Sequence, residues 1–331
     1  MRVERAGVAT TRQPDEAQDQ SIPPQVARSV VDEVERYSSS VAGIELEAVR
    51  AGAGGDPTEV TATTNDRFTF TSSKIGFPML SRTTLRDDMV CIAYMRRTTP
   101  GSLWCEMSLR PGAVIAYARA AEHTARNLAG TQFMFVITDQ VQYEEHADLL
   151  GIRFDPPPHG EVQLLAKTAN TDLVGRTFET FADYAATGRI PPPRVADAVM
   201  RAATRALSAD RCTRRIGSTR AIDKRHIVHN CIDYATSVQR IPSVSELCLA
   251  AHVSERTLRD AFIAEYDLSP LRYFRVWALE EAHRQLIHNE DNPRTVTEIA
   301  TGLGFVHLGR FAGRYKQLYG ETPAATLRAA N

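Results

Sequence analysis

The stretch Thr301–Gln317, TGLGFVHLGRFAGRYKQ, decides how the C-terminal part of the chain is interpreted. Its four glycines allow two interpretations, a phosphate-binding loop or a turn that leads into a helix. A dinucleotide-binding loop needs G-x-G-x-x-G directly after a strand, and a P-loop needs G-x-x-x-x-G-K-[ST]. Gly302, Gly304 and Gly309 fit neither spacing, and TVTEIAT before them has the pattern of a helix. The stretch therefore predicts a turn between two helices.

The same pattern occurs a second time, earlier in the chain. SVSELCLAAHVSERTLRDAFIAEYDLSP begins at Ser243 and aligns with TVTEIATGLGFVHLGRFAGRYKQLYGETP, which begins at Thr295, with one residue inserted just after the turn. The alignment pairs Pro270 with Pro323. Between the copies, PLRYFRVWALEEAHRQLIHN has the uninterrupted apolar spacing of an amphipathic helix. Two copies of one helix-turn-helix joined by a long helix are the simplest explanation.

The second helix of each copy has an apolar inner face and a different outer face, because residues follow one another at 100° around a helix. The inner faces are Leu258, Ala261, Phe262 and Tyr266 in the first copy, and Leu308, Phe311, Ala312, Tyr315, Leu318 and Tyr319 in the second. The outer face of the first copy holds Arg256, Thr257 and Asp260, with Arg259 on its flank and Ser254 placed to cap the helix. The outer face of the second holds Val306, Gly309, Arg310, Gly313 and Gln317, with His307 near its start and Arg314 and Lys316 at its edges.

Helices with arginines at their N-terminal ends suit DNA as a partner. Their backbone N–H groups can meet a phosphate, and an arginine can donate two hydrogen bonds to guanine. A solvated polar face explains the periodicity equally well. Gly309 and Gly313 favour DNA for the second copy, because each costs a helix about 1 kcal/mol relative to alanine. Close approach to another molecule would explain why that cost is kept.

Residues 222–329 resemble the DNA-binding domain of the AraC/XylS family of bacterial transcription regulators. The resemblance rests on SVSELCLAAHVSERTLRDAF, LSPLRYFR, ALEEAHRQLI and TEIATGLGFVHLGRFAGRYKQLYGETPAATLR, in this order and spacing. It implies a sequence-specific regulator in which two recognition helices enter successive segments of the major groove of promoter DNA. The DNA-binding residues that it implies are Ser254, Arg256, Thr257, Arg259, Asp260, His307, Gly309, Arg310, Gly313, Arg314 and Lys316.

The chain departs from the family pattern at several of these positions. His252 stands where a glycine is usual in the first turn, and Asp267 stands where a second glycine is usual, so both are expected in left-handed backbone. Val306 stands where a capping Ser or Asp is common, which predicts a less firmly capped second helix. Few hydrogen-bonding groups are offered by Leu308, Gly309, Ala312 and Gly313. We therefore expect Arg256–Asp260 to carry more of the specificity, and the second helix to dock more than it reads.

The first half of the chain alternates short β-type runs with turn signals, as in FTFTSSKIGF, MVCIAYMRR and TQFMFVIT. Such runs predict a small sandwich or barrel. LRPGAVIAYARAAEHTARNLAGTQFMFVIT resembles, less specifically, the cupin-like sensor domain that is common in the AraC/XylS family. This resemblance implies a pocket for a small-molecule effector, a dimerisation surface, or both.

The predicted fold class is α+β. A cupin-like β-barrel or sandwich with following helices precedes an all-α domain of two helix-turn-helix units joined by a long helix. The predicted divisions are a flexible tail over 1–20, a cupin-like effector and dimerisation domain over 21–155, a helical linker region over 156–221, and an AraC-type double helix-turn-helix DNA-binding domain over 222–329.

Composition places the chain among soluble globular proteins. Of its 331 residues, 43% are hydrophobic and 24% are charged. No apolar run approaches the roughly 20 residues that a membrane-spanning helix needs, and the polar N-terminus does not have the pattern of a secretory signal. We expect a cytoplasmic, nucleoid-associated protein without a membrane partner. Residues 211–331 hold 17 Lys and Arg against 13 Asp and Glu, which is compatible with nucleic acid as a partner.

Metal binding is not predicted, because His123 and His146 stand alone and the H-x-H pair of cupin enzymes does not occur. Three functions remain open. The preferred one is a homodimeric regulator with no enzymatic activity and no cofactor, which senses a small molecule and, as an activator, contacts RNA polymerase. The second is a cupin-type metalloenzyme with an attached DNA-binding module. In the third, the N-terminal domain serves only dimerisation or binding of a protein partner.

Overall fold

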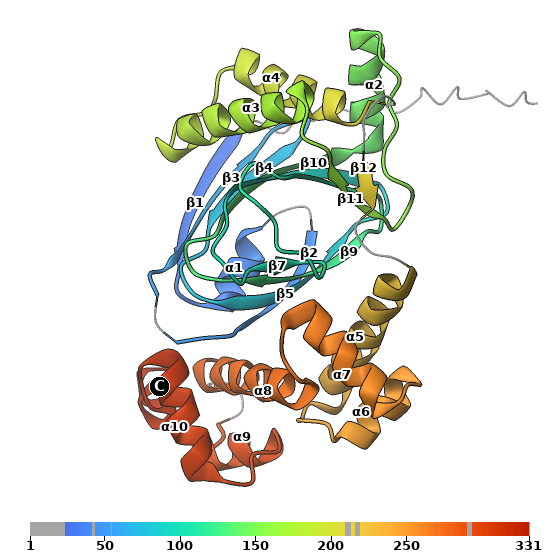
Figure 1. The fold of residues 1–331 in the computed structure, drawn as a ribbon. Coiled ribbons are helices and arrows are strands. Elements are labelled where there is room, and N and C mark those ends of the chain that lie inside the picture. Colours follow the sequence, from blue (N-terminus) through green and yellow to red (C-terminus); the bar gives the residue numbers. More distant parts are fainter. Residues whose placement is uncertain are drawn as a thin grey trace, which may run out of the picture.

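The chain folds into two facing β-sheets followed by a helical domain (Figure 1). The computed structural model describes residues 24–41, 44–53, 55–208, 213–215, 219–289 and 293–330. The predicted α+β class, with a sheet domain before a helical one, is confirmed. Among the described residues, no helix combines the length and the apolar character that crossing a membrane requires.

Sheet A has eight strands in the order β1-β3-β4-β10-β6-β8-β11-β12, and sheet B has four in the order β2-β5-β9-β7. The strands of sheet A are β1 (Gln25–Val31), β3 (Thr58–Thr64), β4 (Thr69–Lys74), β6 (Met89–Arg97), β8 (Val114–Tyr117), β10 (Gln132–Asp139), β11 (Val162–Leu165) and β12 (Thr213–Arg215). The strands of sheet B are β2 (Ile44–Arg50), β5 (Met79–Leu85), β7 (Leu103–Trp104) and β9 (Glu122–Asn127). Neighbouring strands in both sheets pair antiparallel.

Side chains of sheet A point alternately to its two faces, and both faces are apolar. In β10, Phe133 and Phe135 point into the core between the two sheets, whereas Met134 and Val136 point to the opposite face. That opposite face packs against α3 (Ala169–Ala186) and α4 (Pro193–Ala206), which lie across sheet A in Figure 1. The shorter helices of this part are α1 (Val34–Ser40) and α2 (Gln140–Leu150). The sheet domain therefore has one core between its sheets and a second under its helices.

The region 156–221, predicted to be a helical linker, is only partly helical. α3 and α4 fall within it, but β11 and β12 add two strands to the edge of sheet A. β11 has the sequence VQLL, a short run whose pattern fits a buried helix or a strand equally well. Its pairing with β8 decides for the strand, and this partner lies more than forty residues away in sequence.

The helical domain confirms the predicted repeat. It consists of α5 (Thr219–Val238), α6 (Val244–Ala251), α7 (Glu255–Tyr266), α8 (Pro270–Ile287), α9 (Val296–Gly302), α10 (Leu308–Tyr319) and α11 (Pro323–Ala330). The first unit is α6 and α7, the second is α9 and α10, and α8 runs between the units (Figure 1). Both units begin with a capping box, formed by Ser243 with Glu246 and by Thr295 with Glu298.

The turns of the helical domain also follow the sequence. His252 and Asp267 both lie in left-handed backbone, with φ of 54° and 55°, as expected from their positions. Gly302 is the last residue of α9, and Gly304, with φ of 91°, occupies the turn before α10. These two glycines therefore belong to a turn between helices, and the stretch is not a phosphate loop after a strand.

Candidate functional site

The outer face of α7 is open to solvent. Leu258, Ala261, Phe262 and Tyr266 are fully buried, as the helical spacing predicts. The five polar residues of the opposite side are exposed: Ser254, Arg256, Thr257, Arg259 and Asp260. Arg256 makes a 4.0 Å contact with Asp260 one turn later, and 92% of its side chain is exposed. The face can therefore receive a partner without rearrangement of the core.

The outer face of α10 is also open, and it is bare at its centre. His307, Gly309, Arg310, Gly313, Arg314 and Lys316 are all exposed. A Cβ atom built at Gly309 or Gly313 would meet no atom within 4 Å. Phe311, Tyr315 and Leu318 are buried as predicted, but the inward prediction for Leu308 is wrong, since this residue is 38% exposed. Leu308 is the first residue of the helix and lies beyond the core that the later turns cover.

The two recognition helices begin differently. The Ser254 hydroxyl accepts a hydrogen bond from the Thr257 backbone N–H, which caps α7 as predicted. α10 begins after His307, whose side chain makes no capping hydrogen bond. The prediction that Val306 occupies the capping position is wrong, because α10 starts one residue later than expected and His307 is its cap residue. Val306 lies outside the cap and is 86% exposed. The second helix is thus less firmly capped than the first, as the sequence indicates.

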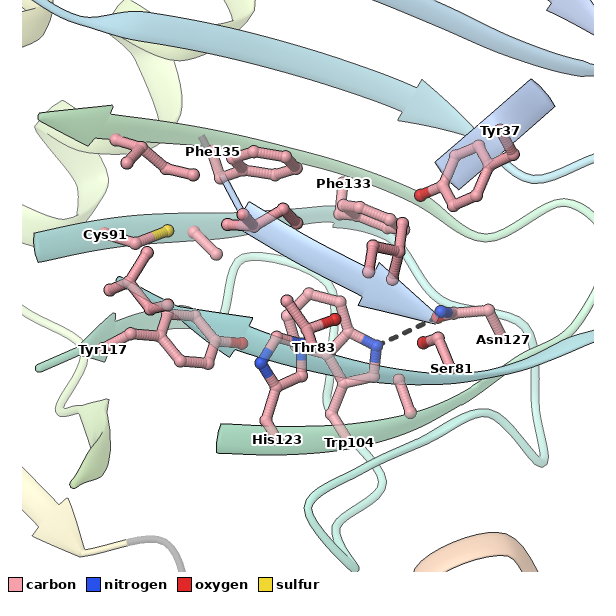
Figure 2. Close-up of a pocket in the computed structure, with 16 residues that line it drawn as sticks. Tyr37, Ser81, Thr83, Cys91, Trp104, Tyr117, His123, Asn127, Phe133 and Phe135 are labelled. Atoms are coloured by element: carbon pink, nitrogen blue, oxygen red, sulfur yellow. Dashed lines mark hydrogen bonds between the residues drawn. The ribbon is translucent and has the colours of Figure 1, made fainter. Parts of the chain in front are cut away.

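A cavity lies between the two sheets, on the side of sheet A that faces sheet B (Figure 2). The space in it that a water-sized sphere can occupy is about 40 Å³, within about 530 Å³ of space between atoms that includes the part open to solvent. The aromatic residues Trp104, Phe133 and Phe135 line it, and the Trp104 indole N–H donates to Asn127 Oδ1 at 3.0 Å. The Tyr117 hydroxyl is buried in this lining and has no hydrogen-bond partner among the described residues. The cavity is therefore mainly apolar, with a few hydrogen-bonding groups.

His123 belongs to this cavity and packs against its aromatic residues. Its ring lies against those of Tyr117 and Trp104, with centroid distances of 4.7 and 5.4 Å. Burial, helped by the charges of Arg225 and His229, lowers the pKa of His123 to about 3, so its imidazole is neutral. Within the part of the chain that the structure describes, no three His, Cys, Asp or Glu side chains come together to hold a metal ion.

β9 connects this cavity to the helical domain. His123, Ala125 and Asn127 point into the cavity, and the alternating residues Glu122, Thr124 and Arg126 point to the opposite face of sheet B. There Glu122 pairs with His229 of α5 at 2.5 Å, and Arg126 pairs with Asp267 at 2.7 Å. The Thr124 hydroxyl donates to Glu265, which lies on α7. One strand therefore contacts the cavity on one side and the first recognition helix on the other.

The other strands of sheet B extend this contact between domains. Val49 of β2 and Leu80 of β5 are buried in one apolar cluster with α5, α7 and α8. Arg82 of β5 pairs with Asp233 of α5 at 2.6 Å. The Tyr266 hydroxyl donates to the backbone carbonyl of Ser81 at 3.4 Å. The sequence did not predict any of these contacts, because each joins residues more than a hundred positions apart.

Glu265 is the buried charge at the centre of this interface. It is fully buried, and among the described residues only the Thr124 hydroxyl donates a hydrogen bond to its carboxyl group, at one of the two oxygens. Burial raises the pKa of Glu265 to about 7, against the hydrogen bond from Thr124. The charge of Glu106 raises this pKa further, whereas Arg225 and Lys224 of α5 lower it. Lys224 also pairs with Glu106 at 3.2 Å.

The docking of the two domains is expected to weaken as the pH rises. A pKa of about 7 in the docked state, above the ordinary value of 4.5, means that docking favours the protonated form. The contribution of Glu265 to the free energy of docking is complete below pH 4.5. It falls by up to about 1.4 kcal/mol per pH unit between pH 4.5 and pH 7. Hydrogen exchange of the β9 and α7 amides should therefore become faster from pH 5.5 to 8, after correction for the intrinsic rate.

Glu265→Gln is the matched control for this pH dependence, since it keeps the size of the side chain and removes the proton equilibrium. Between pH 5.5 and 8 the variant should lose the part of the change that Glu265 causes, whereas the contact between His229 and Glu122 is the same in both proteins. Parallel curves for the wild type and the variant would show that Glu265 does not control docking.

Comparison with known proteins matches the helical domain. A helix-turn-helix domain model matches residues 247–329. The probable thc operon regulatory protein of Rhodococcus erythropolis is 34% identical over 103 residues, which are 31% of each chain. XylDLEGF operon transcriptional activator 2 of Pseudomonas putida is 37% identical over 91 residues, which are 28% of this chain and 58% of that protein. The chain thus spans about a third of the first relative and somewhat more than half of the second.

A solved structure also matches this domain. The structure of a probable AraC family transcriptional regulator from Rhodopseudomonas palustris CGA009 has 32% identity and a TM-score of 0.29, and the match covers 32% of this chain and 97% of that one. The sequence matches coincide with the repeated helix-turn-helix units described above. By this C-terminal domain, the chain belongs to the AraC/XylS family of transcription regulators.

Proposed function

We propose that the chain binds promoter DNA through α7 and α10, and that an uncharged, mainly apolar small molecule in the cavity between the sheets controls this binding. The observation that carries the proposal is the double role of β9. His123 and Ala125 line the cavity, while Thr124 between them holds Glu265 of α7. A molecule that moves β9 therefore acts on the first recognition helix through a direct contact.

The lining of the cavity supports an uncharged molecule. No Lys, Arg, Asp or Glu is among the described residues that line it, and His123 is neutral. A charged ligand would lose its hydration without gaining an ion pair, and that loss is expensive. The flat rings of Trp104, Tyr117 and Phe133 suit a planar apolar ligand, and the unpaired Tyr117 hydroxyl offers it one hydrogen bond.

Control by this molecule follows from its preference for one arrangement of β9. If it binds better when Thr124 and Glu265 are apart, it shifts the population toward undocked helical domains, and in the opposite case it favours docking. Docking restrains α7 but not its outer face, where Arg256 is 92% exposed. The position of α7 relative to α10 is then the quantity that the small molecule changes.

The exposed arginines are the proposed readers of the DNA. Arg256→Ala and Arg310→Ala should each weaken specific binding by about 1 to 3 kcal/mol, because an arginine can bind a guanine with two hydrogen bonds. Binding is measured by gel shift with a site selected from random DNA. Arg189→Ala is the control, since this exposed arginine lies between α3 and α4. If both variants bind as tightly as Arg189→Ala, the assignment of the groove-facing residues is wrong.

Gly313 tests whether the α10 backbone approaches the DNA. Gly313→Ala should stabilise the free protein by up to about 1 kcal/mol, because alanine is the better helix former and its Cβ would meet no atom within 4 Å. The same methyl group should weaken DNA binding if the backbone lies close to the duplex. Chemical denaturation measures the first effect and gel shift the second. A variant that is more stable and binds DNA as tightly as the wild type would contradict close approach.

Tyr117 and Tyr143 provide a matched pair for the small-molecule site. Both hydroxyls are buried and unpaired among the described residues, but Tyr143 packs on the far face of sheet A. Tyr117→Phe should bind a cavity ligand about fivefold more weakly, since one neutral hydrogen bond contributes about 1 kcal/mol. Tyr143→Phe should bind it unchanged.

The measurement is a thermal shift against a panel of uncharged aromatic compounds, supported by the fluorescence of Trp104 in the cavity wall. Ala125→Leu, which fills the cavity, should abolish the shift. A ligand that shifts the wild type and the Ala125→Leu variant equally binds elsewhere. If no compound in a broad panel shifts the wild type, the N-terminal domain is better explained as a dimerisation or protein-binding module.

A further inference from the structure

The start of α10 carries an exposed aliphatic group that the fold does not use. Val306 is 86% exposed, and Leu308, two residues later, is 38% exposed. Val253, in the equivalent place before the Ser254 cap, is half-buried against the core of the first unit. In the second unit Phe305 occupies the core, with 8% exposure. The one-residue insertion after the turn therefore leaves Val306 as an extra aliphatic residue outside the core.

Val306 contributes little to the stability of the free protein. At the residue before a helix cap, an aliphatic side chain can stabilise the helix by packing against the fourth helical residue, which is Phe311 in α10. With 86% exposure, Val306 makes little use of that contact. It also provides no capping oxygen, and His307 beside it makes no capping hydrogen bond. The methyl groups of Val306 are therefore free to contact a partner.

The surroundings of Val306 indicate a polyanion as that partner. α10 contains Arg310, Arg314 and Lys316 and no acidic residue, and all three basic side chains are exposed. The outer face between them is bare at Gly309 and Gly313, so another backbone can come close. In a recognition helix the N-terminal residues reach the base edges. The only apolar group that bases present in the major groove is the 5-methyl group of thymine.

We propose that Val306 reads thymine, with its methyl groups in contact with the 5-methyl group of a thymine base in the groove segment that receives α10. This inference rests on the proposed DNA-binding function. It gives the second recognition helix a specificity of its own, which depends on shape and burial rather than on hydrogen bonds. It thereby revises the expectation that this helix mainly docks.

Replacement of thymine by uracil tests this proposal directly, because it removes only the 5-methyl group. A binding site is first selected from random DNA with the full-length protein, and each thymine is then replaced by uracil, one at a time. At one thymine of the half-site bound by α10, the wild type should bind about fourfold more weakly after the replacement, as expected for one buried methyl group. The Val306→Ala variant, which keeps only the Cβ methyl group, should show a smaller difference between the thymine and uracil forms of that site.

Two controls keep the outcomes distinct. Val306→Ile retains an aliphatic group and should still prefer thymine, and Val30→Ala, which alters an exposed valine of β1, should bind like the wild type. An equal thymine preference in the wild type and Val306→Ala, or none in either, would overturn this inference while the DNA-binding function stands. If selection enriches no sequence at all, the proposed function itself fails, and this inference fails with it.

Discussion

Sheet B packs against protein on both of its faces, and the rest of the structure depends on this constraint. An antiparallel sheet commonly packs one face on a core and exposes the other to water. Here one face of sheet B closes the core between the sheets, and the other carries Val49 and Leu80 into the core of the first helix-turn-helix unit. A movement of the sheet B strands therefore changes the packing of both the core between the sheets and the core of the first helix-turn-helix unit.

Three polar residues on the outer face of sheet B contact the helical domain, and their contacts stay partly open to water. Arg82, Glu122 and Arg126 each have an oppositely charged or titratable partner in the helical domain. Exposed pairs of this kind contribute little to stability, so they orient the domains more than they hold them together. Glu265 differs because it is fully buried and one of its oxygens is unpaired among the described residues. A buried carboxyl opposes docking when it is charged, which keeps the contact reversible.

The sequence predicted those features that depend on local pattern. The inner face of α7 and the turn at Gly304 follow from spacing and residue type, because each is determined within one helix or turn. The left-handed backbone of His252 was expected only from the resemblance to the family, which usually has a glycine at this position. The prediction for Leu308 was wrong because helical spacing assigns a side to a residue without saying where the core ends. β11 was missed because only its pairing with β8 distinguishes VQLL from a helical turn.

The contacts between the domains could not be predicted in this way. Glu265 has the pattern of an ordinary surface glutamate of a helix, and its burial comes from Thr124, which lies 141 residues earlier. The cavity likewise needs residues from strands of both sheets, whose pairing no single stretch of sequence specifies. One signal was available in the sequence, the stretch EHTARN of β9, which has polar residues on both faces of the strand. Such a strand is expected to contact polar groups on each side.

The single residue inserted before α10 has a consequence for the molecule as a whole. The outer faces of the two recognition helices also differ, with Arg256, Thr257 and Asp260 on one and Gly309, Arg310 and Gly313 on the other. The insertion makes the two ends chemically unlike, since one recognition helix begins with a capped, hydrogen-bonding turn and the other with an uncapped aliphatic one. On promoter DNA the two helices would then prefer different half-sites. A single chain would therefore bind in one direction along the promoter, without a second copy.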